Sequence, residues 1–113
     1  MHELGIAMEI AELAAARAGD QQVHRIVIEV GAFTAVLPDA LAFAWEAATE
    51  DSALAGSTLE IVTVAGRGAC RRCGAEQAMP AIFTRCACGG TDLAVLAGEE
   101  LRIRELEVSA RCA

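Results

Sequence analysis

The segment 67–98 places the strongest constraint on how this chain can fold. It holds four of the five cysteines, and it has no periodic run of apolar residues long enough to build a core of its own. Glycines bound it on both sides: Gly66, Gly68 and Gly98. A chain of 113 residues makes one small domain, or one domain with a smaller lobe held together by cross-links such as a bound metal. Something other than apolar burial must therefore hold this segment.

The four cysteines form two close pairs, Cys70 with Cys73 and Cys86 with Cys88. The first pair is CxxC followed by glycine, which is the spacing of a zinc knuckle. The second pair is CxC, and its two residues point to the same side of an extended chain, so both thiolates can reach one ion in a tight turn. The spacing predicts a four-sulfur Zn(II) site. Because protein ligands would fill all four positions, this zinc would be structural rather than catalytic.

Other roles for the cysteines compete with zinc binding. A redox-active pair of Cys70 and Cys73 is one, although no βαβ pattern surrounds the CxxC. A disulfide framework is disfavoured because five cysteines are an odd number and the chain starts without a secretory signal. Cys112 has no partner at knuckle spacing, and we interpret it as an incidental thiol. Reduced, metal-bound cysteines favour a cytoplasmic protein.

Two helices are predicted before the cysteine segment. Residues 4–18 carry apolar side chains at helical spacing, such as Ile6, Ile10 and Leu13, and Gly19 ends the pattern. A second helix has Pro38 near its first turn, where the missing N–H costs nothing. Its apolar stripe consists of Leu37, Leu41, Ala44, Trp45 and Ala48.

Three strands are predicted, over residues 23–30, 59–65 and 101–108. The first alternates between apolar and charged residues, which is typical of a half-buried strand. In the third, the apolar residues change parity after Ile103, which predicts a bulge or twist near Arg104. Pairing all three strands antiparallel, with both helices on one face, would bury both helical stripes.

The predicted fold class is thus α/β, of the α+β kind. A three-stranded antiparallel sheet with two helices would form one domain from residues 1–66 and 99–113. Residues 67–98 would be inserted into this domain as a zinc-ribbon-like lobe.

The charge and hydropathy of the chain exclude several classes of function. Its net charge is −7, it contains no lysine, and only 4% of its residues are aromatic, so nucleic-acid binding is disfavoured. The cysteine segment itself has a net charge of +2. We interpret this charge as compensation for the negative charge of four thiolates on one zinc ion rather than as a phosphate-binding site. Charged residues interrupt every apolar run before it reaches the length of a membrane span.

The N-terminus offers a second possible metal site. Met1, His2 and Glu3 bring together an α-amine, an imidazole and two backbone amides, and planar nitrogen donors select Ni(II) or Cu(II). Taken alone, the motif is more often an exposed terminus, and Glu3 is equally suited to the first turn of a helix. Asp39 has the same helix-dipole interpretation, and His24 is interpreted as a structural histidine.

The chain resembles the HypA/HybF family of nickel metallochaperones in several stretches. These are the opening Met1-His2-Glu3-Leu4-Gly5-Ile6, then Ile28-Glu29-Val30-Gly31-Ala32-Phe33, Leu41-Ala42-Phe43, the paired cysteines, and Gly98-Glu99-Glu100-Leu101-Arg102-Ile103. The stretches cover the whole chain in order. Members of that family serve the maturation of [NiFe]-hydrogenase.

The resemblance implies a nickel carrier rather than an enzyme. Nickel would bind at His2 and the backbone from Met1 to Glu3, and zinc at the two cysteine pairs. The family usually has CxxC in both pairs, so the CxC of this chain is one residue short. The implied partners are a HypB-type GTPase and the hydrogenase large subunit, and a homodimer is compatible with the chain. The alternative is a zinc-ribbon module for protein or nucleic-acid binding without a nickel role.

Overall fold

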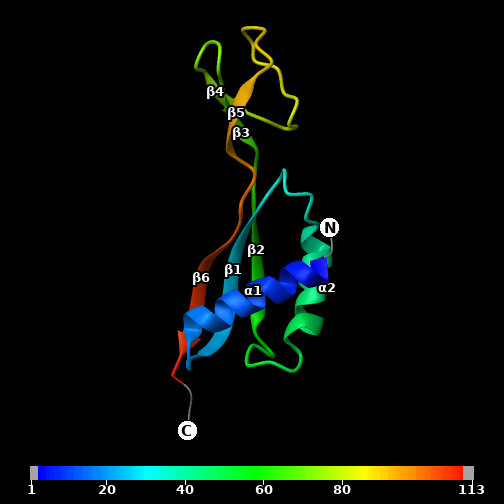
Figure 1. The fold of residues 1–113 in the computed structure, drawn as a ribbon, viewed down its shortest axis with the longest axis vertical. Coiled ribbons are helices and arrows are strands. Elements are labelled where there is room, and N and C mark those ends of the chain that lie inside the picture. Colours follow the sequence, from blue (N-terminus) through cyan, green and yellow to red (C-terminus); the bar gives the residue numbers. More distant parts are fainter. Residues whose placement is uncertain (1–2, 111–113) are drawn as a thin grey trace. The chain divides into compact units, whose positions relative to one another are not determined.

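The computed structural model describes residues 3–110, which form two helices and six strands (Figure 1). The chain divides into two compact units. Residues 3–29, 36–62 and 102–110 make up the first, and residues 30–35 and 63–101 the second. Neither described helix is long and apolar enough to cross a membrane.

Helix α1 (Glu3–Ala18) confirms the predicted first helix, but its buried face differs from the expected one. Leu13 is 54% exposed, whereas Ala7 and Ala14 are fully buried. The buried residues are Ile6, Ala7, Ile10, Ala11, Ala14 and Ala18. Small side chains at a helix contact allow two helices to approach closely, and α1 packs against the second helix through this face.

Helix α2 (Pro38–Thr49) confirms the predicted second helix and begins at the proline. Leu37 lies at the N-cap in an extended conformation and is 63% exposed, so it is not part of the buried stripe. The stripe starts at Leu41, which is fully buried, and continues through Ala44 and Trp45. Figure 1 shows α1 crossing the face of the sheet with α2 beside it.

The sheet of the first unit has the order β2-β1-β6, with β1 (Gln22–Gly31) between β2 (Thr58–Val64) and β6 (Leu101–Ser109). Ile26 and Ile28 are completely buried, as the alternation predicts. Val27 points to the opposite face and is only 3% exposed, so the middle of this strand is buried on both faces rather than half-buried.

The strand directions correct one detail of the predicted sheet. Arg25 pairs with Glu60, and the Ala32 N–H donates to the Val64 carbonyl at 2.9 Å, so residue numbers rise together along β1 and β2. These two strands are therefore parallel, and only β6 is antiparallel to β1. The reason is α2, which returns the chain to the starting end of the sheet before β2 begins (Figure 1). The α+β class with two helices and a three-stranded sheet is confirmed.

Strand β6 contains the irregularity predicted near Arg104. Arg102 pairs with Glu29, and Glu107 pairs with Arg25 at 3.7 Å. The two β1 residues are four apart and their β6 partners five apart, which is the offset that an irregular strand produces. The half-buried positions of β6 also change parity between Ile103 and Leu106. Both observations indicate an irregularity of β6 between Arg102 and Glu107.

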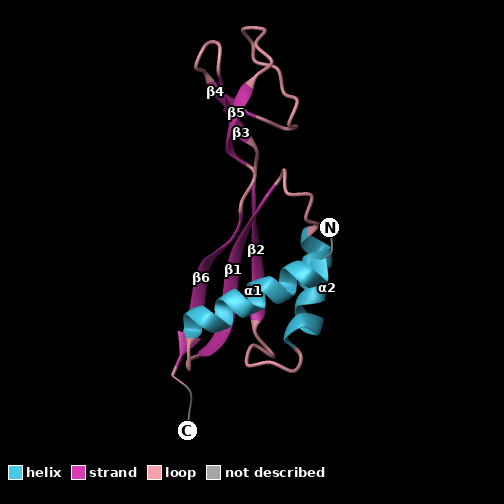
Figure 2. Cartoon of the chain, viewed as in Figure 1, coloured by secondary structure: helices cyan, strands magenta, loops and turns pink. Residues whose placement is uncertain are grey.

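The second unit is built on a small antiparallel sheet of order β4-β3-β5. Its strands are β3 (Arg67–Cys70), β4 (Glu76–Ala78) and β5 (Leu93–Ala97). Figure 2 shows that this unit consists of strands and loops. Sheets of such short strands are marginal without a further constraint, which agrees with the lack of periodicity in the sequence.

A single aromatic ring packs against two glycines of the second unit, and a third glycine, Gly31, lies against the Gly98 backbone. A Cβ at Gly66 would lie 2.3 Å from the Phe33 ring, and one at Gly98 would lie 2.6 Å from it. Gly98 also has φ +119, which other residues rarely adopt. The Phe33 N–H donates to the Gly98 carbonyl at 2.7 Å. We call Phe33 with Gly31, Gly66 and Gly98 the Phe33 cradle.

Replacing Gly31 with alanine is expected to destabilise the protein by about 3 kcal/mol or more, because the added Cβ would lie 2.0 Å from the Gly98 carbonyl oxygen. Gly5→Ala is the matched control. Gly5 lies within α1 with no heavy atom within 4 Å of an added Cβ, so this change should stabilise by about 0.5–1 kcal/mol. Urea unfolding followed by circular dichroism measures both, and equal midpoints for Gly31→Ala and the wild type would contradict the close packing.

Candidate metal centre

The four predicted cysteines lie together in the second unit. Their sulfur atoms are all within 4.8 Å of one another, and the Cys70–Cys88 and Cys73–Cys86 pairs are each 3.6 Å apart. A tetrahedral zinc ion with Zn–S bonds of about 2.3 Å holds its sulfurs about 3.8 Å apart. A disulfide needs about 2.05 Å, and the structure has all four as free thiols. The arrangement fits a tetrahedral ion.

The first knuckle positions Cys70 and Cys73 through a tight turn after β3. The Cys70 N–H donates to the Ala75 carbonyl at 2.9 Å, and the Gly74 N–H donates to the Cys70 carbonyl at 2.8 Å. Gly74 has φ +79, so the glycine after the CxxC supplies the left-handed residue that closes the turn. The Arg72 N–H also points at the Cys70 sulfur, 3.4 Å away.

The second knuckle shows how a CxC can replace a CxxC. The Cys86 N–H donates to the Gly90 carbonyl, and the Gly89 N–H donates back to the Cys86 carbonyl, each at 2.9 Å. Gly89 has φ +90, and a Cβ at Gly90 would lie 2.8 Å from the Cys70 sulfur. The two glycines after Cys88 therefore make the tighter turn that the short spacing requires.

Electrostatics in the cluster favour a cation. The backbone N–H of Cys73, and then that of Arg72, lower the pKa of the Cys70 thiol to about 6. The Gly90 N–H lowers the pKa of Cys88, but burial and the neighbouring sulfurs outweigh it and raise that pKa to about 12. Four sulfurs this close cannot all lose their protons unless a positive charge compensates. Zn(II), which prefers thiolate ligands, would supply that charge.

The predicted nickel ligands Met1 and His2 lie outside the described residues, and so does Cys112. Glu3 is described and is the first residue of α1. Its carboxylate Oε2 accepts a hydrogen bond from the Leu37 N–H at 3.4 Å. The start of α1 is thus held beside the start of α2, a contact that the spacing of the sequence did not indicate.

The other histidine and acid singled out in the sequence have structural surroundings. His24 Nε2 lies 2.6 Å from the Ser109 hydroxyl, which joins β1 to β6. Asp39 is exposed in the first turn of α2, where a negative charge suits the helix dipole. Among the described residues, the four cysteines are the one group of three or more potential ligands that could hold a metal.

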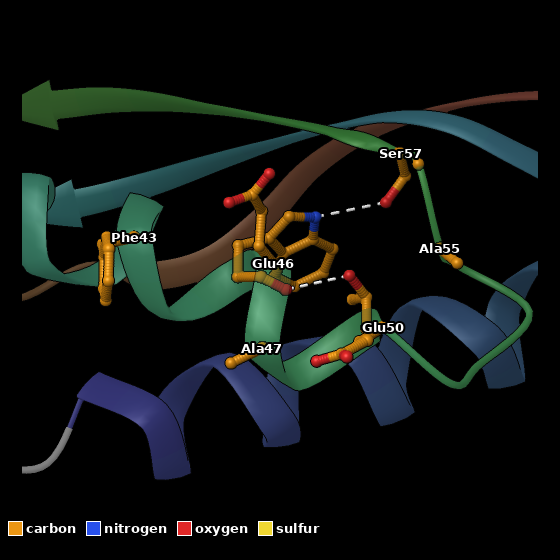
Figure 3. A pocket seen from close by; sticks show the side chains of 9 residues that line it. Phe43, Glu46, Ala47, Glu50, Ala55 and Ser57 are labelled. Atoms are coloured by element: carbon orange, nitrogen blue, oxygen red, sulfur yellow. Dashed lines mark hydrogen bonds between the residues drawn. The ribbon is translucent and has the colours of Figure 1, made fainter.

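A hollow of about 570 Å³ lies beside α2 in the first unit (Figure 3). Phe43, Glu46 and Glu50 line it, and the Trp45 indole N–H donates to the Ser57 hydroxyl at its edge, at 3.1 Å. In this view both helices lie on the same side of the strands. The hollow contains no set of converging metal ligands, so it is not a second metal centre.

Comparison with known proteins identifies the family. The model described as "Hydrogenase/urease nickel incorporation, metallochaperone, hypA" matches residues 1–108. The hydrogenase maturation factor HypA of Geotalea uraniireducens is 44% identical over 109 residues, covering 96% of this chain and 99% of that protein. The factor of the same name from Nostoc sp. is 41% identical over 112 residues, 99% of each. The solution structure of the Ni metallochaperone HypA from Helicobacter pylori shares the fold, with a TM-score of 0.71 at 23% identity over 98% of this chain and 100% of that one. The chain therefore belongs to the HypA family of hydrogenase and urease nickel-incorporation metallochaperones.

Proposed function

We propose that this chain binds Ni(II) at its N-terminus and delivers it for the maturation of [NiFe]-hydrogenase. The observation that carries the proposal is the family match over residues 1–108, which includes the opening Met1-His2-Glu3. The four-sulfur cluster supports it from another direction, because it provides a separate site for zinc and leaves the N-terminus for a metal that prefers nitrogen.

The proposed nickel ligands are the α-amine of Met1, the imidazole of His2, and the amide nitrogens of His2 and Glu3. Four nitrogens in a plane suit Ni(II). Glu3 begins α1, and the first N–H groups of a helix have no partner within that helix, so its amide is available to lose a proton and bind. The hydrogen bond from Leu37 to the Glu3 carboxylate would hold this amide in place beside α2.

The proposed role of Zn(II) is to hold the second unit together. Cys70, Cys73, Cys86 and Cys88 would bind it as thiolates, which closes the site to substrate. Zinc on these ligands would supply folding free energy, and its affinity would fall as the pH falls because protons compete for the sulfurs. We propose a carrier rather than an enzyme on this basis.

The proposed setting is the cytoplasm, with a HypB-type GTPase and the hydrogenase large subunit as partners. A nickel site at the end of a chain suits delivery, since a partner can replace its ligands one by one. Copper binds such nitrogen donors at least as tightly as nickel does, so metal selection would depend on availability and on these partners.

Nickel titration of zinc-loaded, untagged protein tests the proposal. We expect His2→Ala to weaken Ni(II) binding by more than the roughly 10–100-fold that loss of an outer contact costs, because it removes a direct ligand. His24→Ala is the matched control and should bind nickel like the wild type, since His24 contacts Ser109. Isothermal titration with a competing chelator measures both. Equal affinities for wild type and His2→Ala would reject the site and leave the alternative of a zinc module without a nickel role.

A further inference from the structure

We propose that the hollow beside α2 is a docking site for a partner protein, which lays into it an extended segment carrying two basic side chains. The hollow belongs to the first unit, and residues of α2 and of the segment that leads into β2 line it. None of these lining residues is a proposed ligand of nickel or zinc. The inference therefore goes beyond the proposed nickel function and does not depend on it.

The hollow has an apolar wall that is open to solvent. Phe43 lines it and is 82% exposed, although it is part of a helix whose other face is well buried. Ala47, Ala55 and Gly56 also line the hollow, and their side chains are too small to fill it. This concave surface thus has room for side chains of another molecule, with an aromatic ring available to contact them.

Two glutamates select a basic occupant for the hollow. Glu46 and Glu50 line it one helical turn apart, and neither forms an ion pair with another described residue. Figure 3 shows Phe43, Glu46 and Glu50 in that order along α2. The sequence contains no lysine, arginine or histidine between Arg25 and Arg67, so nearby residues of the chain supply no compensating charge. Charge complementarity therefore favours a cationic segment of a partner.

The placement of these two glutamates is unfavourable for the chain without a partner. Glu46 lies in the last turn of α2 and Glu50 is its C-cap residue, and that turn contains no basic residue. The C-terminal end of a helix carries a partial negative charge, which disfavours carboxylates there. Two like charges four residues apart on a helix also repel each other. A cationic ligand removes both penalties.

The spacing of the three side chains defines the segment that fits. Side chains four residues apart on a helix lie about 5–6 Å from each other. In an extended chain, alternate side chains point to the same side and lie about 6.4–6.8 Å apart. Two arginines or lysines separated by one residue can therefore reach Glu46 and Glu50 together. The next alternate side chain then reaches the Phe43 ring, where an apolar group is favoured.

Titration of zinc-loaded, isotope-labelled protein with a short peptide, followed by NMR, tests the proposal. The probe is an acetylated and amidated peptide of sequence Ser-Leu-Ser-Arg-Ser-Arg-Ser, and the control peptide has glutamine in place of both arginines. Trp45 is the only tryptophan of the chain, and its indole N–H donates to Ser57 at the edge of the hollow. A single indole resonance therefore reports on binding. We expect it to shift to saturation with a dissociation constant on the order of 0.1–1 mM, and the glutamine peptide to bind about tenfold more weakly.

The double variant Glu46→Gln with Glu50→Gln distinguishes a docking site from a merely solvated helix face. It should bind the arginine peptide about tenfold more weakly than the wild type, because two ion pairs are lost. Its thermal midpoint should nevertheless rise by a few degrees, because the repulsion at the end of α2 is gone. Glu9→Gln is the matched control, since it neutralises an exposed glutamate of α1, and should bind like the wild type.

Salt dependence gives a further readout of the charges. Raising the ionic strength from about 0.01 to 0.1 M shortens the screening length from about 30 to 10 Å and should weaken binding to the wild type. The proposal is overturned if the indole resonance does not move at a peptide concentration about tenfold above the expected constant. It is also overturned if the glutamine peptide binds equally well, or if the double variant keeps the affinity of the wild type. An indole shift that follows protein concentration without peptide would mean that a second copy occupies the hollow, and would overturn it too.

Discussion

Replacing Cys73 with serine is expected to abolish zinc binding and unfold the second unit, while α1 and α2 remain helical. Binding of a structural zinc ion is worth about 10–16 kcal/mol at neutral pH, which equals or exceeds the 5–15 kcal/mol of a whole domain. The strands of this unit, β3, β4 and β5, are too short to persist by themselves. Loss of one ligand should therefore remove the main stabilising contribution in this part of the chain.

Zinc content and amide hydrogen exchange measure this result. Wild type should contain about one zinc per chain, and the amides of β3 and β5 should lose protection in Cys73→Ser while those of α1 keep it. Cys112→Ser is the matched control and should retain both zinc and protection. Freshly reduced wild type that contains no zinc, yet keeps its second unit protected, would rule out the structural role. A redox role for Cys70 and Cys73 predicts instead an unchanged fold in Cys73→Ser.

Adding two residues before Met1 is expected to remove tight Ni(II) binding without changing stability. The extension converts the α-amine into an amide and moves it away from His2, so the planar set of nitrogens is broken. We expect a loss larger than the 10–100-fold typical of outer contacts. The same two residues added after Ala113 should leave nickel binding unchanged.

Visible absorption during nickel titration distinguishes the outcomes, because square-planar Ni(II) has a d–d band that octahedral Ni(II) in water lacks. The band should form with wild type and with the C-terminal extension, and should be absent with the N-terminal extension. A band of equal intensity in all three proteins would show that nickel binds elsewhere. Zinc content should be equal in all three, which separates this result from any loss of the second unit.

The four-cysteine cluster could be predicted from the sequence because its geometry is encoded locally. Two cysteines separated by one or two residues and followed by glycine define a turn that brings both sulfurs together, and Gly74 and Gly89 do adopt positive φ as such turns require. The second pair, Cys86-Ala-Cys88, is one residue shorter than a CxxC, yet its sulfurs still join the cluster because Gly89 and Gly90 form the tighter turn.

Strand direction and packing could not be predicted with the same success, since they depend on contacts between distant residues. The alternation of residues 23–30 is the same for a parallel and an antiparallel strand, and only the return of the chain through α2 decides the direction of β2. The buried face of α1 was also partly mispredicted. Alanine contributes little to a hydrophobic periodicity, so the sequence pattern did not single out Ala7 and Ala14, which are fully buried. The change of parity in β6 is visible in the sequence, and the half-buried positions Ile103, Leu106 and Val108 follow it.

The Phe33 cradle determines which residues a fragment of this protein must contain to keep the second unit intact. The four cysteines lie within one continuous segment, 63–101, so excising that segment would seem sufficient to isolate the cluster. Phe33 comes from a different part of the chain, residues 30–35, and fills the space above Gly66 and Gly98. A fragment of residues 63–101 would keep all four cysteines but would lose the Phe33 ring that packs against Gly66 and Gly98. Grafting the complete unit into another protein therefore requires residues 30–35 as well as residues 63–101.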